Sequence, residues 1–380
     1  MNQQALRAVF MRGGTSKAVV FNRAELPPDR SAWSDIFLSV MGSPDPYGRQ
    51  LDGMGGGISS LSKVCVVGPP TRPDADIDYT FAQVSVDSPV VDYSGNCGNM
   101  SSAVGPFAVD EGLVIPTATD EAVVRINNTN TDRVIVARFP LVDGRAAVYG
   151  DEEVDGVAGT GATVRLDFLE PAGGKTGTLL PTGNPVDELT LSNGDRVPAS
   201  MVDLANPCVF VAADTVGLRG TELPDLIDAS PAVATRLEEI RRLASVAMGL
   251  APDLAGAAAL ASIPKVAVVA APLEYATMSG RTIDAAAVDI LVRMISMGRA
   301  HRAVPVTGAL CLAGSCRVPG SIAHTLLSDH DDGDIRIGHP SGVLTVDSSV
   351  ETHDGRPHIR SATVYRTARR LFEGNVLYRR

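Results

Sequence analysis

Two segments of small, apolar residues constrain the fold more than any other feature of this chain. Residues 99–112 and 307–315 each have a helical pattern that is apolar along most of its length, and each follows a tight polar turn. A helix that is apolar on every side is usually buried. Since strand-like runs surround both segments, we expect a β-sheet wrapped around each helix. This duplicated topology predicts an α+β fold, because strands and helices do not alternate regularly.

The other expected elements follow from β-branched runs and from apolar periodicity. We predict strands at residues 5–11, 18–22, 62–67, 78–86, 123–127, 133–139, 199–204, 208–213, 265–270, 335–337, 343–346 and 359–365. We predict further helices at residues 31–41, 230–250, 284–299 and 367–372. The Gly/Pro/Thr-rich stretch 170–187 indicates a boundary between two domains, 1–185 and 186–380. The last strand and helix, about 359–380, are expected to pack back on the first domain.

Charge and apolar content exclude several classes of protein. The chain has 33 basic and 44 acidic residues, a formal net charge of −11, whereas electrostatic binding of nucleic acid needs a basic face. No apolar run approaches the ~18 residues of a membrane helix. The N-terminus has no signal-peptide pattern. We therefore expect a cytoplasmic protein without nucleic-acid or membrane partners. The sequence leaves open whether the protein forms a homodimer.

Cysteine usage agrees with that compartment and sets one thiol apart. The five cysteines fit neither a disulfide scaffold nor a zinc site, and four of them are expected to be buried small hydrophobes. Cys97 differs because it lies in SGNCGN (94–99), at the predicted start of a helix, where the helix dipole favours a thiolate. Glycines on both sides of Cys97 let backbone N–H groups approach an anion closely, and Asn96, Gly98 and Asn99 are candidate substrate-binding residues. A capping turn with an incidental cysteine is the alternative.

Lys63 opens a strand of valine and cysteine that should be buried. Burial desolvates a lysine, and desolvation lowers the pKa of such a side chain until it can act as a base. A strand-end lysine that reaches solvent is the alternative. The glycine run at 55–57 precedes this strand, whereas nucleotide-binding glycine loops follow a strand, so we expect no nucleotide.

Further polar positions suit an anionic ligand. Thr15 and Ser16, in MRGGTSK (11–17), offer hydroxyls at a turn between strands, although Gly-Thr-Ser is also ordinary turn chemistry. His301 and His339 stand in polar turns, the latter in GHPSG with Ser341, and a solvated or structural histidine is the alternative for each. No group of residues has the spacing of metal ligands, and we expect neither a metal nor another cofactor.

A series of longer blocks occurs in order over nearly the whole chain. They are MRGGTSK, MGSPDPYGRQLDGMGGG followed by SSLSK, FAQVSVDSPVVDYSGNCGN, PTGNPVD and GHPSG. In these blocks the chain resembles the 2-methylaconitate cis–trans isomerase family, whose relatives include 4-oxalomesaconate tautomerase and the methylitaconate and aconitate isomerases. The resemblance implies a diaminopimelate epimerase-like fold, with two similar domains and the active site in the cleft between them.

The resemblance also implies roles for single residues. Lys63 matches the base of the family, and Cys97 matches the first of the two catalytic thiols of the parent epimerases. The position of the second thiol falls near Thr307, where this sequence has no cysteine, so a two-thiol racemase is not expected. Asn206, which precedes Pro207, matches the asparagine of the Asn-Pro turn that holds a substrate carboxylate in this fold. Thr307 is expected to bind another carboxylate.

The expected function is that of a cofactor-independent isomerase. It would shift a double bond, or invert cis/trans geometry, in an unsaturated di- or tricarboxylate by proton transfer through a dienolate. The segments DPYGRQLDG and VDYSGNCGN look closer to the 2-methylaconitate branch than to the oxalomesaconate branch. The alternatives are 4-oxalomesaconate tautomerase and methylitaconate isomerase. A non-catalytic carboxylate-binding protein is the alternative of another class. Lys63 and Cys97 favour the enzyme, because binding alone needs neither a base nor a thiol.

Overall fold

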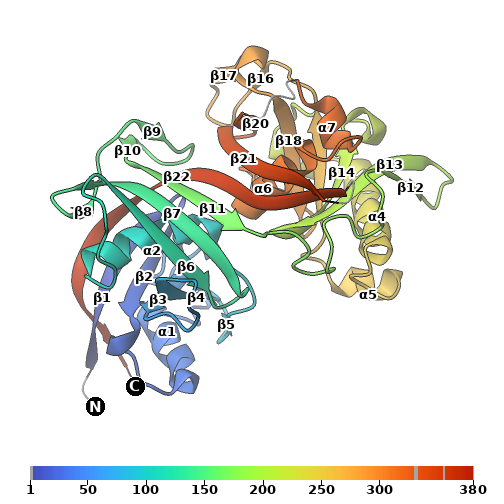
Figure 1. Ribbon diagram of the computed structural model, residues 1–380. Coiled ribbons are helices and arrows are strands. Elements are labelled where there is room, and N and C mark those ends of the chain that lie inside the picture. Colours follow the sequence, from blue (N-terminus) through green and yellow to red (C-terminus); the bar gives the residue numbers. More distant parts are fainter. Residues whose placement is uncertain (1–2, 329–332, 354–355, 380) are drawn as a thin grey trace. The chain divides into compact units, whose positions relative to one another are not determined.

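The chain forms two compact units, one of which is built from two separate stretches of sequence. The computed structural model describes residues 3–328, 333–353 and 356–379. Unit 1 consists of Met1–Leu169 together with Tyr365–Arg380, and unit 2 is the continuous stretch Glu170–Val364. Figure 1 shows the long last strand, β22 (Arg356–Tyr378), which contributes residues to both units.

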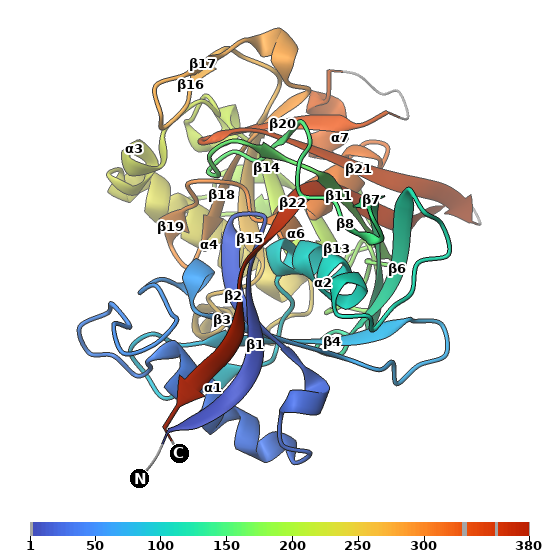
Figure 2. The same ribbon diagram turned by 90° about the vertical axis from the view of Figure 1, so that its left-hand side faces the viewer.

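Unit 1 consists mainly of strands that surround one helix. Its helices are α1 (Trp33–Met41) and α2 (Gly98–Asp110). Its strands are β1 (Gln4–Gly13), β2 (Ser16–Asn22), β3 (Lys63–Gly68), β4 (Ile77–Val84), β5 (Val91–Asp92), β6 (Glu121–Asn128), β7 (Arg133–Val142), β8 (Arg145–Ala146), β9 (Glu152–Glu153), β10 (Thr160–Gly161) and β11 (Thr163–Leu169). α2 packs against β1, β2, β3, β6, β7, β8 and β11, and Figure 2 shows it among these strands.

The two faces of the β2–β3–β4 sheet meet different helices. Val64 and Val66 of β3 join the apolar cluster that includes Phe37 of α1. Because side chains alternate across a strand, Lys63 and Cys65 lie on the opposite face, where β3 contacts α2. The small residues of α2 permit close packing there: a Cβ at Gly105 would lie 2.8 Å from the Phe139 ring.

Unit 2 repeats this plan with additional helices. Its helices are α3 (Pro224–Asp228), α4 (Pro231–Ala247), α5 (Leu254–Ala259), α6 (Val306–Cys316) and α7 (Ile322–Leu326). Its strands are β12 (Asp187–Thr190), β13 (Arg196–Leu204), β14 (Asn206–Ala212), β15 (Lys265–Ala270), β16 (Tyr275–Ala276), β17 (Thr282–Ile283), β18 (Ile290–Ser296), β19 (Arg299–Ala300), β20 (Ile335–His339) and β21 (Gly342–His353), joined by the first part of β22.

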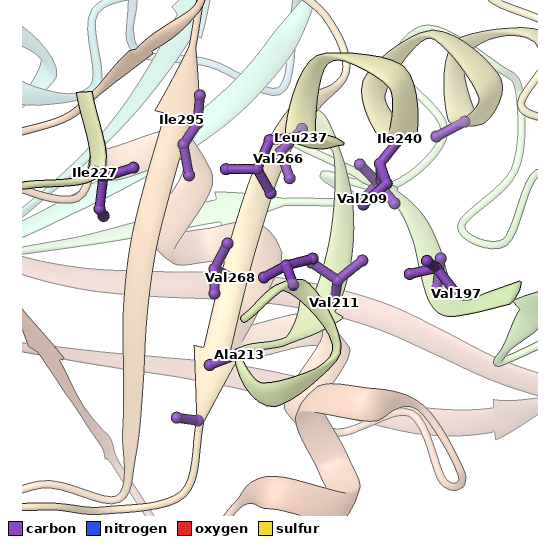
Figure 3. Close-up of a cluster of buried hydrophobic side chains, with 14 of the residues drawn as sticks. Val197, Val209, Val211, Ala213, Ile227, Leu237, Ile240, Val266, Val268 and Ile295 are labelled. Atoms are coloured by element: carbon purple, nitrogen blue, oxygen red, sulfur yellow. The ribbon is translucent and has the colours of Figure 1, made fainter. Parts of the chain in front are cut away.

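Helix α4 covers one face of the unit 2 sheet. Figure 3 shows Leu237 and Ile240 of α4 near Val209 of β14 and Val266 of β15, all within one buried cluster. The small-residue helix α6 packs against β13, β14 and β21. The prediction of an α+β fold with strands around a buried small-residue helix is therefore confirmed in both units. Among the described residues, no helix is long and apolar enough to cross a membrane.

Two predicted helices are wrong. The predicted helix 284–299 is a short 3-10 turn followed by strand β18. This strand is buried on both faces, and a continuous apolar run of that kind resembles a buried helix in sequence. The predicted helix 367–372 is part of β22, which pairs antiparallel with β1, so tertiary pairing overrides the helical preference of Ala, Arg and Leu.

Candidate active site

The amino end of α2 is a turn that carries Cys97. Cys97 is its N-cap residue and has an extended backbone, and no side chain caps the helix. The first N–H groups of an α-helix have no partner within the helix, and they lie at the positive end of its dipole. Cys97 is half-buried, whereas Cys65, Cys208, Cys311 and Cys316 are buried, which confirms the prediction that four cysteines are core residues.

Lys63 lies at the first position of β3, on the face of the sheet that meets α2. Only 7% of the side chain is exposed. Its Nζ donates to Oε1 of Gln83 at 2.5 Å and lies 5.0 Å from the ring centroid of Phe81. Gln83 is itself fixed, because its Nε2 donates to the carbonyls of Ser59 and Ser62. Within the described part of the chain no carboxylate pairs with Lys63, and an amide oxygen can accept a hydrogen bond from either an amine or an ammonium.

Cys65 shows that Lys63 and Cys97 lie in the same neighbourhood of unit 1. Burial raises the pKa of the Cys65 thiol to about 12, and both Cys97 and Lys63 make smaller electrostatic contributions to that value. Cys65 donates a weak hydrogen bond to the hydroxyl of Tyr79 at 3.7 Å. The buried, protonated thiol of Cys65 is a packing group that lies near both Lys63 and Cys97.

The Gly13–Gly14–Thr15 turn approaches the start of α2 closely. Oγ1 of Thr15 accepts a hydrogen bond from Nδ2 of Asn99 at 3.0 Å. A Cβ at Gly13 would lie 2.6 Å from the Asn99 carbonyl oxygen, so only glycine permits this approach. Thr15 is exposed and Ser16 is buried. The structure thus brings Thr15 to the Cys97–Asn99 turn, while Ser16 belongs to the packed start of β2.

Arg366 is a residue of this site that the sequence analysis missed. It is buried, and its Nε donates to Oδ1 of Asn99 at 3.1 Å. Burial lowers the pKa of Arg366 to about 10, so the guanidinium stays charged at neutral pH. Together with Thr15, Arg366 fixes the orientation of the Asn99 amide. No local sequence pattern predicts this role, because Arg366 and Asn99 are 267 positions apart in the sequence and are brought together only by the fold.

The amide side chains of Asn128 and Asn130, which the sequence analysis missed, support the same turn together with the predicted residue Asn96. Nδ2 of Asn96 donates to Oγ of Ser101 at 3.3 Å, and Nδ2 of Asn128 donates to Oδ1 of Asn96 at 3.3 Å. The side chain of Asn130 accepts a hydrogen bond from the Phe81 N–H and donates one to the Phe81 carbonyl, and the ring of Phe81 lies against Lys63. The amide-rich run NNTN at 127–130, directly after a predicted strand, is the signal that could have revealed these residues.

Unit 2 holds the other predicted site residues. Thr307 is the second residue of α6, and the cysteine nearest to it along that helix, Cys311, is fully buried with a pKa well above its usual range, mainly through burial. The start of α6 therefore offers no thiol, as the sequence predicts. Asn206 begins β14 after the turn residue Ala205, and no described contact joins its side chain to the histidines discussed next.

The histidine positions of unit 2 lie close together. Nδ1 of His339 accepts a hydrogen bond from the Ser341 amide at 3.2 Å, and Oγ of Ser341 donates to the Arg302 carbonyl at 2.6 Å. His301 therefore sits beside the turn that holds His339 and Ser341. His339 is buried, while His301 is half-buried. Among the residues that the structure describes, no cluster of His, Cys, Asp and Glu could hold a metal ion.

Comparison with known proteins identifies the family of the chain. A family model described as "PrpF protein" matches residues 3–379. The chain belongs to the PrpF family. The crystal structure of methylitaconate-delta-isomerase superimposes with a TM-score of 0.90 at 42% identity, over 100% of this chain and 96% of that one.

Named relatives cover almost the whole chain. A 3-methylitaconate isomerase from Eubacterium barkeri is 43% identical over 99% of this chain and 97% of the relative. A 2-methyl-aconitate isomerase from Cupriavidus necator is 40% identical, with 98% and 96% covered. A (4E)-oxalomesaconate Delta-isomerase from Novosphingobium sp. (strain KA1) is 39% identical, with 99% and 98% covered.

A more distant structure bears on the fold alone. A hydroxyproline epimerase from Agrobacterium vitis matches with a TM-score of 0.51 at 13% identity, over 98% of this chain and 92% of that one. The α+β architecture of this PrpF family member therefore agrees with the diaminopimelate epimerase-like fold that its sequence implies.

Proposed function

We propose that this protein is an isomerase of unsaturated di- or tricarboxylates in which Lys63 is the catalytic base. One observation carries the proposal: Lys63 is buried on the α2 face of β3, is held by a neutral amide and lies in the same neighbourhood as Cys97. A buried amine without a carboxylate partner can take a proton from carbon. The named isomerases among the relatives in the PrpF family support this reaction class.

The groups around Lys63 match the needs of an allylic proton shift. Lys63 removes a proton from a carbon next to the alkene, and the resulting dienolate spreads its negative charge onto a carboxylate oxygen. The N–H groups of Gly98 and Asn99, with the dipole of α2, stabilise that charge. The Asn99 amide and Thr15 hold a neighbouring carboxylate. Return of the proton to the far carbon, or to the same carbon after rotation, completes the isomerisation.

A substrate panel tests the proposal. Relatives named for three different substrates match this chain at 39–43% identity, so the panel contains 2-methylaconitate, methylitaconate, 4-oxalomesaconate and trans-aconitate. We expect proton NMR to show double-bond movement or cis/trans inversion in at least one of them without an added cofactor. From the sequence segments quoted above, 2-methylaconitate is the first choice. Unchanged spectra for all four compounds would contradict an isomerase and favour a carboxylate-binding protein.

Cys97 is expected to be less critical than Lys63. Because the start of α6 has no second thiol, most proton transfer should pass through the lysine. We expect Cys97→Ser to keep measurable turnover, about 1–10% of wild type, since a hydroxyl still fills the N-cap position but is a weaker acid. Initial rates of Cys97→Ser and Lys63→Ala on the same substrate check this. If the two variants are equally inactive, Cys97 is an obligatory acid or base.

A further inference from the structure

The loop at 42–57 places one buried polar side chain in the interior of unit 1. Tyr47 and Leu51 of this loop are exposed, whereas only 1% of Gln50 is exposed. Gln50 also has φ +53°, in the left-handed region, where residues other than glycine are uncommon. Such a conformation persists only where the surrounding structure imposes it. The contacts of Gln50 therefore show what this loop is built to hold.

The nitrogen and the oxygen of the Gln50 amide both have hydrogen-bond partners. Nε2 donates to Oγ of Ser43 at 2.8 Å and to Oγ of Ser62 at 2.7 Å, and Oε1 accepts from the Gly57 N–H at 3.0 Å. A Cβ at Gly55 would lie 2.2 Å from Oε1, so only glycine permits this approach. The glycine run that precedes β3 thus packs around the Gln50 amide, and the amide links three separate parts of the chain.

Ser62 connects Gln50 to Lys63. It is the residue before Lys63, it is fully buried, and its Oγ donates to the Val84 carbonyl at 2.9 Å. The Ser62 carbonyl accepts from Nε2 of Gln83 at 2.9 Å, and Oε1 of the same Gln83 amide accepts from Lys63. The backbone of Ser62, with φ −121° and ψ 68°, is neither helical nor extended, so its conformation depends on these hydrogen bonds. Loss of the bond from Gln50 would loosen both the amine and the amide that holds it.

We propose that Gln50 is a positioning residue that fixes the Lys63–Gln83 pair through Ser62. A displacement of about 1 Å at a reacting group can slow catalysis about 10²-fold, so proton transfer by Lys63 requires a fixed amine. That Lys63 is the catalytic base rests on the function proposed above. The positioning of its amine rests on the contacts of Gln50, Ser62 and Gln83.

Acetylation of lysines in the full-length protein tests this role without a substrate. The chain has only four lysines, Lys17, Lys63, Lys175 and Lys265, so mass spectrometry can follow each of them separately. Sulfosuccinimidyl acetate labels an amine faster when the amine reaches solvent more often. We expect Gln50→Met to raise the labelling rate of Lys63 about 5- to 10-fold, the size expected for loss of one hydrogen bond, and to change the other three rates less than about twofold. A general loosening of the fold would raise the other rates as well.

Ser62→Ala isolates the link to Lys63, and Ser43→Ala is its matched control. Each variant removes one hydroxyl partner of the Gln50 amide, but only Ser62 leads on to Lys63. We expect Ser62→Ala to raise the labelling rate of Lys63 about 5-fold and Ser43→Ala to change it less than about twofold. If Gln50→Met does not fold, these two serine variants decide the test. Equal labelling of Lys63 in both serine variants, or in Gln50→Met and wild type, would overturn the proposal.

Steady-state kinetics extend the test to the reaction. On a panel compound that isomerises, Gln50→Met should lower kcat about 10- to 100-fold and change KM less than about threefold, because the variant displaces the base and leaves the groups that bind substrate in place. A higher KM with an unchanged kcat would contradict a positioning role. If the labelling of Lys63 changes as expected but no panel compound isomerises, the proposed function fails and the positioning of Lys63 by Gln50 stands.

Discussion

Lys63→Ala should lower the rate of isomerisation at least 10²–10⁴-fold while the protein stays folded. Loss of a general base commonly has an effect of that size, and it is larger when no second base replaces it. The structural cost is smaller, about 1–2 kcal/mol, because Lys63 makes one hydrogen bond, to Gln83, and rests on the Phe81 ring. Initial rates under saturating substrate, with circular dichroism and thermal melting, measure the two effects separately.

Lys63→Arg and Lys175→Ala complete this experiment. Arginine keeps the positive charge but does not release its proton near neutral pH. If Lys63 is the base, Lys63→Arg is as inactive as Lys63→Ala; if it only binds a carboxylate, the arginine variant keeps much of its activity. Lys175→Ala, in an exposed loop, should match wild type. Near-normal turnover by Lys63→Ala would remove Lys63 from the mechanism.

Gly14→Ala should cost both stability and activity. Gly14 has φ +49°, in the left-handed region, and a Cβ there would lie 2.2 Å from Oδ1 of Asn99. The backbone strain costs about 1 kcal/mol, and displacement of the Asn99 amide from Thr15 and Arg366 adds about 1–2 kcal/mol. We expect an unfolding free energy lower by about 2–3 kcal/mol and turnover at least 10-fold slower, since Asn99 then moves away from the proposed anion site.

Gly144→Ala is the matched control for Gly14→Ala. Gly144 has φ +74°, and a Cβ there would meet nothing within 4 Å. This variant isolates the cost of backbone strain, about 1 kcal/mol, without the contact to Asn99. Denaturant unfolding and initial rates compare the two variants. Equal losses of stability together with wild-type turnover for both would show that the approach of Gly14 to Asn99 does not support the site.

The sequence could predict those parts of the candidate site that are formed by a single turn, strand or helix end. The start of α2 with Cys97, the strand that opens with Lys63 and the turn at Thr15 each combine residue types with a strong positional preference. Arg366 could not be found in this way, because its role depends on β22 pairing with β1 across more than 350 residues. The prediction of a helix at 284–299 was wrong for a related reason. The strand there is buried on both faces, so it lacks the alternation of apolar and polar residues that identifies a strand in sequence.

The division of unit 1 between both ends of the chain has a consequence for how the protein is made. Synthesis proceeds from the N-terminus, and domains generally fold as units as they emerge from the ribosome. Unit 2 is continuous, so it can fold once Val364 has emerged. Unit 1 must wait for Tyr365–Arg380, and until then the edge of β1 that later pairs with β22 is open to other strands. A nascent chain would therefore complete its second unit first, and the stretch before Glu170 is where chaperone protection matters most.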